Sequence, residues 1–144
     1  MIKDVVLTSL DVIDLVGGNV FHIMKKSSPG YQSFGEAYFS QINQGVIKAW
    51  KRHKIMTLNI VVPVGSIKFV LFDDRDESNA IFQELIISRD NYIRLTVPPN
   101  IWVGFQGLAN KESMLLNISN IEHDYKEAVR LDVDEINYDW SRSI

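Results

Sequence analysis

The segment GVIKAWKRHKIMTLNIVVPVGSIKFVLFDDR, residues 45–75, decides the fold of this chain. It contains two apolar runs, 58–62 and 67–72, that are rich in β-branched and aromatic residues. The sequence Pro63-Val64-Gly65-Ser66 between them is typical of a turn. A basic run, Lys48 to Lys54, comes first. The pattern predicts successive β-strands, and we expect this stretch to supply much of any active or binding site.

The basic run has two faces if it forms a strand, because side chains then alternate between the two sides. One predicted face holds Ile47, Ala49, Lys51 and His53. The other holds Val46, Lys48, Trp50 and Arg52. A β-bulge within the strand would mix these two sets.

Short β-prone segments continue on both sides of this centre. A double glycine, Gly17-Gly18, separates two of them and predicts a hairpin turn. The turn signals recur roughly every 8–12 residues, which is typical of a β-sandwich or β-barrel. No stretch carries a clean helical stripe. The sequence therefore predicts an all-β chain with little helix.

Residues 34–44 permit two interpretations. Phe34, Tyr38 and Ile42 would share one face of a helix, but neighbouring aromatic and apolar residues would then be misplaced. As a strand, the segment places Glu36, Tyr38 and Ser40 on one face. We prefer the strand, whose polar face would line a ligand pocket inside a barrel or sandwich.

The composition sets limits on function. The chain of 144 residues, 46% hydrophobic and 23% charged, predicts a single globular domain spanning 1–144. A net charge of −3 argues against a nucleic-acid partner. The chain has no cysteine, which excludes disulfides and thiol catalysis. No apolar run is long enough to span a bilayer or to act as a signal peptide, so we expect a cytoplasmic protein without membrane insertion.

Four motifs together resemble the dTDP-4-dehydrorhamnose 3,5-epimerase family. They are Gly45 to Trp50 followed by His53, Val64 to Arg75, Asn91 to Pro99 followed by Gly104-Phe105, and Tyr138-Asp139-Trp140. The resemblance covers roughly residues 34–140. It implies a cupin-type double-stranded β-helix, or jelly roll, that forms a homodimer through exchanged strands. It also implies a nucleotide-linked 4-keto-6-deoxy sugar as ligand and proton abstraction beside the ketone, with no cofactor.

The chain departs from the family at catalytic positions. Lys51 stands where the family has its catalytic histidine, with His53 two residues later, and Val103 replaces a second histidine. His123 is the nearest equivalent of the family's acidic tyrosine. The base-orienting aspartate lies in a C-terminal segment that we expect this chain to lack. Lys48 is the counterpart of the family's phosphate-contacting cation.

These residues define the predicted site. His53, Lys51 and His123 are the candidate catalytic residues. The two imidazoles suit proton transfer near neutral pH, and the Lys51 ammonium suits binding of a phosphate or stabilisation of an enolate oxygen. Lys48, Glu36, Tyr38 and Trp102 are the candidate substrate-binding residues. We expect no metal, because a lysine at a ligand position repels a cation and three dispersed histidines do not form a cluster.

Two functions remain open at this stage. The first is an epimerase or isomerase of an activated 4-keto sugar, which the polar face of Glu36, Tyr38 and Ser40 favours. The second is a non-catalytic nucleotide-sugar-binding protein that has lost the base, which the departures at the catalytic positions favour.

Overall fold

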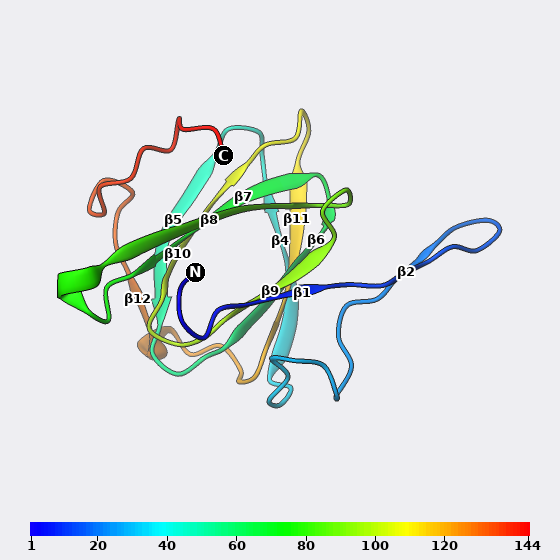
Figure 1. The fold of residues 1–144 in the computed structure, drawn as a ribbon, viewed down its shortest axis with the longest axis horizontal. Coiled ribbons are helices and arrows are strands. Elements are labelled where there is room, and N and C mark those ends of the chain that lie inside the picture. Colours follow the sequence, from blue (N-terminus) through cyan, green and yellow to red (C-terminus); the bar gives the residue numbers. More distant parts are fainter.

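The computed structural model describes all residues from 1 to 144, and antiparallel strands make up almost all of its regular structure (Figure 1). The strands are β1 (Val6–Ser9), β2 (Val12–Ile13), β3 (Val20–Phe21), β4 (Glu36–Ile42), β5 (Ile47–His53), β6 (Leu58–Val64), β7 (Ser66–Asp73), β8 (Ile81–Ser88), β9 (Ile93–Val97), β10 (Trp102–Gly107), β11 (Ser113–Ser119) and β12 (Ala128–Arg130). Two short 3-10 turns are η1 (Glu77–Asn79) and η2 (Tyr125–Glu127). No helix is long and apolar enough to cross a membrane.

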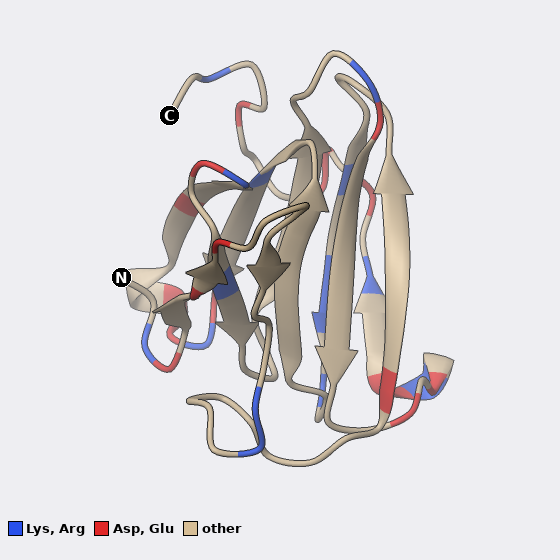
Figure 2. Cartoon of the chain, turned by 90° about the vertical axis from the view of Figure 1, so that its right-hand side faces the viewer, with Lys and Arg blue, Asp and Glu red and all other residues tan.

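The strands form two five-stranded sheets. The first has the order β1-β9-β6-β11-β4 and the second the order β12-β5-β10-β7-β8. Strands far apart in sequence are neighbours in both sheets, as in a jelly roll, so the predicted all-β cupin-type fold is confirmed. Figure 2 shows that several basic residues lie along strands rather than in loops.

The main core lies between the two sheets. Strands β6 and β7 supply much of it, because alternate residues of each strand point inward. These inward residues include Ile60, Val62, Phe69 and Leu71, all at most 4% exposed. Burying each such side chain stabilises the fold by about 1.5–3 kcal/mol.

The chain crosses from one sheet to the other at Gly65, between β6 and β7. Gly65 has φ +78°, and a Cβ atom there would lie 2.3 Å from Ser113 Oγ. The Ser113 hydroxyl accepts a hydrogen bond from the Ser66 N–H and donates one to the Ser66 carbonyl oxygen. The crossover therefore requires both a left-handed backbone and a residue without a side chain.

A bulge in β5 changes the predicted faces of the basic run. Lys51 is opposite Val103 on β10, but Lys48 is opposite Phe105, so two residues of β5 face one residue of β10. The extra residue turns Lys48 onto the same side as Lys51. The prediction of strict alternation was therefore wrong for Lys48, which lines the same cavity as Lys51 and His53.

A second apolar cluster lies outside the second sheet. The C-terminal segment, residues 131–142, packs back on this face and buries Trp140 against Trp50 and Trp102. The Lys68 ammonium fastens the segment by donating hydrogen bonds to the carbonyls of Trp140 (2.7 Å) and Arg142 (3.1 Å). The Tyr138-Asp139-Trp140 motif is therefore held against the body of the protein.

The predicted hairpin at Gly17-Gly18 forms an arm. Strands β2 and β3 pair only with each other and project from the body (Figure 1). The arm exposes apolar side chains, namely Val12, Ile13, Leu15, Val16 and Val20.

We expect Gly65→Ala to destabilise the fold by at least about 2 kcal/mol, since alanine is strained at positive φ and would also collide with Ser113. Gly45→Ala is the matched control, because Gly45 has φ +74° but open space around its Cα. It should cost about 1 kcal/mol. Urea unfolding of both variants measures the difference, and equal losses would contradict a role for the close approach.

Candidate active site

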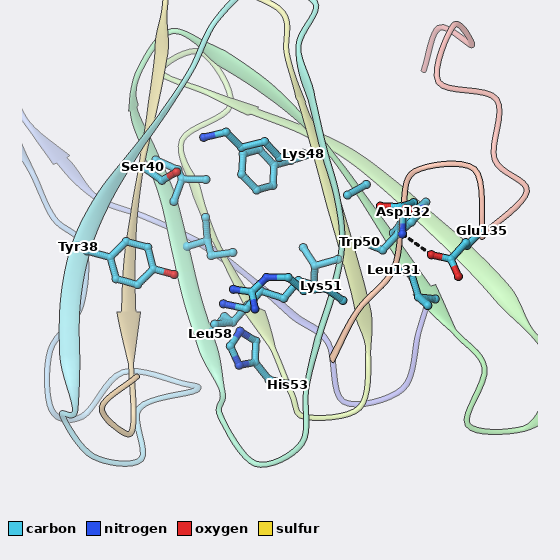
Figure 3. A pocket seen from close by; sticks show the side chains of 16 residues that line it. Tyr38, Ser40, Lys48, Trp50, Lys51, His53, Leu58, Leu131, Asp132 and Glu135 are labelled. Carbon is cyan, nitrogen blue, oxygen red and sulfur yellow. Dashed lines mark hydrogen bonds between the residues drawn. The ribbon is translucent and has the colours of Figure 1, made fainter. Parts of the chain in front are cut away.

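A cavity of about 660 Å³ lies between the two sheets (Figure 3). Apolar residues of β6, β10 and β11 form part of its wall, and Leu131 of the C-terminal segment closes one side. Its polar and charged lining residues are Tyr38, Ser40, Lys48, Lys51, His53, Arg130, Asp132 and Glu135. A largely apolar cavity with a few convergent polar groups is the usual form of a small-molecule site.

His53 and Glu127 form a buried pair at this cavity. His53 is 4% exposed and Glu127 6% exposed, and His53 Nδ1 contacts Glu127 Oε1. The second oxygen of Glu127 accepts hydrogen bonds from the backbone N–H groups of Lys54 (3.2 Å), Ile55 (3.2 Å) and Met56 (3.3 Å). These three donors fix the carboxylate, and the carboxylate in turn fixes the imidazole ring.

The surroundings of this pair keep the imidazole neutral. Burial lowers the pKa of His53, and the charge of Lys51 adds to this effect, against the raising influence of Glu127. Burial would raise the pKa of Glu127, but hydrogen bonds from His53 and the backbone hold it below its ordinary value. A carboxylate therefore accepts the Nδ1 proton, and Nε2 is left as an unprotonated base.

Three cations line the same cavity as His53. Burial and the neighbouring charge of Arg130 lower the pKa of Lys51, against the raising influence of Glu127 and Glu36. Lys48 Nζ donates a hydrogen bond to the Gln41 carbonyl oxygen at 2.6 Å. Lys48, Lys51 and Arg130 all line the cavity, which therefore suits an anionic ligand.

Tyr38 lies across the cavity from the basic run. It comes from β4 in the first sheet, whereas His53 comes from β5 in the second. Its hydroxyl points into the cavity in Figure 3. Burial raises the pKa of Tyr38, the amide of Asn117 lowers it, and the charge of Glu36 raises it again.

The structure brings together only some of the predicted site residues. His53, Lys51, Lys48 and Tyr38 line the cavity, and Val103, which stands at the position of the family's second histidine, lies opposite Lys51. Glu36 shares the inward face of β4 but does not line the cavity.

Trp102 and His123 do not line the cavity either, although His123 lies close enough for its charge to lower the pKa of His53. The Trp102 ring packs in the outer cluster, where Nε1 donates a hydrogen bond to Asp74 (3.0 Å) and the ring lies 4.3 Å from the Arg52 guanidinium. This position gives the predicted role of Trp102 in substrate binding no support. His123 is exposed in the loop before η2.

Sequence reasoning missed Glu127 and Arg130. Both belong to the segment around β12, where the sequence shows no clear strand periodicity. The register of β12 against β5 places Ala128 opposite His53 and Arg130 opposite Lys51. Only this long-range pairing places Glu127 and Arg130 beside His53 and Lys51. The short run Ala128-Val129 is the sole local signal of a strand.

The described residues offer no ready metal site. No group of three or more His, Asp or Glu side chains gathers closely enough to hold a metal ion. The carboxylates Asp132 and Glu135 line the cavity, but the other charged groups that line it are the cations Lys48, Lys51 and Arg130.

No protein-family model matches the sequence. Among solved structures, a dTDP sugar isomerase from Desulfovibrio desulfuricans G20 is 34% identical and has a TM-score of 0.92, with 99% of this chain and 94% of that chain covered. A dTDP-4-dehydrorhamnose 3,5-epimerase from Bacillus anthracis str. Ames, solved with TDP and PPi bound, is 19% identical with a TM-score of 0.84 and covers 99% and 87% of the two chains. Among curated proteins, a probable low-salt glycan biosynthesis epimerase from Haloferax volcanii is 28% identical in an alignment 151 residues long that covers 99% of this chain and 97% of that protein.

We expect Glu127→Ala to lower the free energy of unfolding by about 3 kcal/mol, because His53 and three backbone N–H groups would lose their buried acceptor. Glu122→Ala, which removes an exposed carboxylate nearby, should change stability by no more than about 0.5 kcal/mol. Urea unfolding measures both. A loss no larger in Glu127→Ala than in Glu122→Ala would show that the pair is not a strong structural contact.

Proposed function

This chain belongs to the family of dTDP-sugar isomerases and dTDP-4-dehydrorhamnose 3,5-epimerases, and we propose that it is an epimerase or isomerase of a nucleotide-activated 4-keto-6-deoxy sugar in glycan biosynthesis. The family assignment rests on the isomerase that is 34% identical over nearly the whole of both chains. The observation that carries the activity is the buried pair of His53 and Glu127 at a cation-lined cavity.

The pair supports proton abstraction beside a ketone. The C4 ketone makes the protons on C3 and C5 acidic, and His53 Nε2 is the base that would remove one of them. The electron pair of the broken C–H bond moves toward the ketone oxygen and forms an enolate. The Glu127 carboxylate stabilises the imidazolium, and the Lys51 ammonium stabilises the enolate oxygen.

The remaining cations support binding of the nucleotide part. We propose that Lys48 and Arg130 contact the diphosphate, because both line the cavity beside the catalytic groups. This chemistry needs proton transfer and fixed charges only, so it calls for no metal or organic cofactor. Of the other predicted residues, Glu36 acts through its charge on Lys51 and Tyr38, and we assign no direct contact to Trp102 or His123.

The second candidate is a nucleotide-sugar-binding protein without catalysis. Lys51 and Val103 favour it, because both replace histidines of the family motif. The orientation of His53 by a buried carboxylate favours catalysis, since a ligand-binding surface has no need of a neutral, fixed imidazole.

We also propose that the protein is a cytoplasmic homodimer. A nucleotide-activated sugar is made from a nucleoside triphosphate, which is a cytoplasmic metabolite. The dimer is supported by the family resemblance and by the arm, whose Val16 is fully exposed although apolar. Finding the native protein in an extracytoplasmic fraction would contradict this location.

Sedimentation velocity at micromolar concentration should show a mass of two chains. Leu15→Glu combined with Val16→Glu should shift the protein to a monomer, because both apolar side chains are exposed on the arm. Ile144→Glu changes an exposed apolar residue at the C-terminus and should leave the dimer intact. A monomeric wild-type protein would rule the dimer out.

The activity is tested by solvent exchange. In D₂O the protein should incorporate deuterium at C3 or C5 of a dTDP-4-keto-6-deoxy sugar, as read by NMR and mass spectrometry. His53→Ala should reduce incorporation by at least about 100-fold, because the base is lost. His22→Ala, which lies outside this cavity, should leave incorporation unchanged.

Binding of the sugar nucleotide without any incorporation would favour the non-catalytic candidate.

The same deuterium-incorporation assay, measured as a function of pH, reports on the protonation of His53. The pKa of His53 is lowered, so incorporation should fall on the acid side at a pH below the ordinary histidine value of about 6.5. An acid limb above that value would show that His53 is not the titrating base.

A further inference from the structure

We propose that a second cavity, outside the first sheet, binds a phosphate group and that the guanidinium of Arg94 anchors it. This cavity has a volume of about 180 Å³ and is lined by residues of β1, β9 and the loop that follows β3. It shares no residue with the cavity of His53, so the proposal is independent of the isomerase function.

The side chain of Arg94 points away from the main core. Leu95 and Val97 on the same strand belong to that core, and alternate residues of a strand point to opposite faces. Arg94 is nevertheless only 1% exposed. It therefore lies at the base of the second cavity, which it lines.

The loop between β3 and β4 holds the guanidinium in place. Arg94 Nη1 donates a hydrogen bond to the Ile23 carbonyl oxygen at 2.6 Å, and Nη2 donates one to the Pro29 carbonyl oxygen at 2.5 Å. Nη2 also donates to Thr8 Oγ1 at 3.4 Å. All three acceptors are neutral, so they fix the guanidinium without balancing its charge.

The positive charge of Arg94 has no counterion within the protein. None of the ion pairs of the chain includes Arg94, and its buried Nε has no hydrogen-bond partner. Burial lowers the pKa of Arg94, and no neighbouring carboxylate offsets this effect. Because a guanidinium stays protonated in proteins, and a buried charge is normally paired, an anion is the ligand that this position favours.

The rest of the lining suits a phosphate group. Lys25 adds a second positive charge, and Thr8, Ser9 and Ser28 add hydroxyl groups. Ser28 Oγ accepts a hydrogen bond from the Lys25 N–H at 2.8 Å, which leaves its own proton free to donate. Phosphate offers several acceptor oxygens to such a set of donors, and arginine and lysine are its usual partners.

Two features limit the affinity and the size of the ligand. Asp11 also lines the cavity, and its exposed carboxylate repels an anion. The volume of about 180 Å³ compares with about 660 Å³ for the cavity of His53, so the second cavity suits a single phosphate group rather than a whole sugar nucleotide.

The Arg94 Nε–H resonance in a ¹⁵N NMR spectrum reports directly on this site. Titration with inorganic phosphate at constant ionic strength should move this resonance in a saturable way, with a Kd of about 1 mM or lower. Chloride at the same ionic strength should not move it. His53→Ala, which removes the proposed catalytic base, should leave the phosphate response unchanged, because His53 does not line this cavity.

Exposed residues provide the variants, since they can be changed with little risk to folding. Lys25→Ala should weaken phosphate binding at least about threefold, because a charge-assisted contact is lost. Lys26→Ala is the matched control, because Lys26 is exposed and does not line the cavity. Asp11→Asn should strengthen binding at least about threefold. Thermal unfolding checks that each variant is folded.

The phosphate group could belong to free phosphate or to a phosphate ester, and the same titration with methyl phosphate distinguishes the two. Tighter binding of methyl phosphate would identify an ester as the ligand. Tighter binding of inorganic phosphate would identify the free ion. Either result supports a phosphate site at Arg94.

Three outcomes would overturn the proposal. The first is a wild-type Arg94 Nε–H resonance that phosphate does not move, and the second is an equal response to chloride. The third is equal phosphate affinity in Lys25→Ala and Lys26→Ala, which would show that the anion acts on Arg94 from outside this cavity. A phosphate response without deuterium incorporation would remove only the isomerase function, and the reverse result would remove only the phosphate site.

Discussion

The bulge in β5 is the constraint on which the site and the C-terminal packing both depend. It turns Lys48 to the inner side with Lys51, while Trp50 on the outer side packs against Trp140. Gly104 on the neighbouring strand makes room for it, because a Cβ atom there would lie 2.8 Å from Ala49 Cβ and 2.9 Å from the Trp140 ring. The bulge in β5 therefore positions both the cations of the cavity and the tryptophan against which the C-terminal segment packs.

The balance of charge and burial inside the cavity explains how such a basic strand can face inward. The imidazole of His53 is neutral, and the carboxylate of Glu127 is held by backbone N–H groups as well as by the ring. Lys51 and Lys48 remain in contact with the cavity rather than in the closed core. Buried charge is thus limited to groups with several partners, as its solvation cost demands.

Much of the fold could be predicted from the sequence, because strand periodicity and turn residues are local signals. The inward face of Tyr38 and Ser40 and the hairpin at Gly17-Gly18 followed from such signals. The inward turn of Lys48 did not, because a bulge depends on the neighbouring strand. Glu127 could not be found either, since it meets His53 across 74 residues of sequence. The identity of a buried partner is set by strand order, which short-range patterns do not encode.

Because Lys68 fastens the C-terminal segment, loss of the cavity wall and unfolding of the sheets can occur separately. This segment supplies Leu131, Asp132 and Glu135 to the cavity wall, yet few strand hydrogen bonds hold it to the sheets. Its release would leave both sheets paired and their shared apolar interior closed. Local opening of the C-terminal segment would therefore disrupt the cavity while the sandwich stays folded, and a ligand bound against the segment would stabilise the cavity more than the global fold.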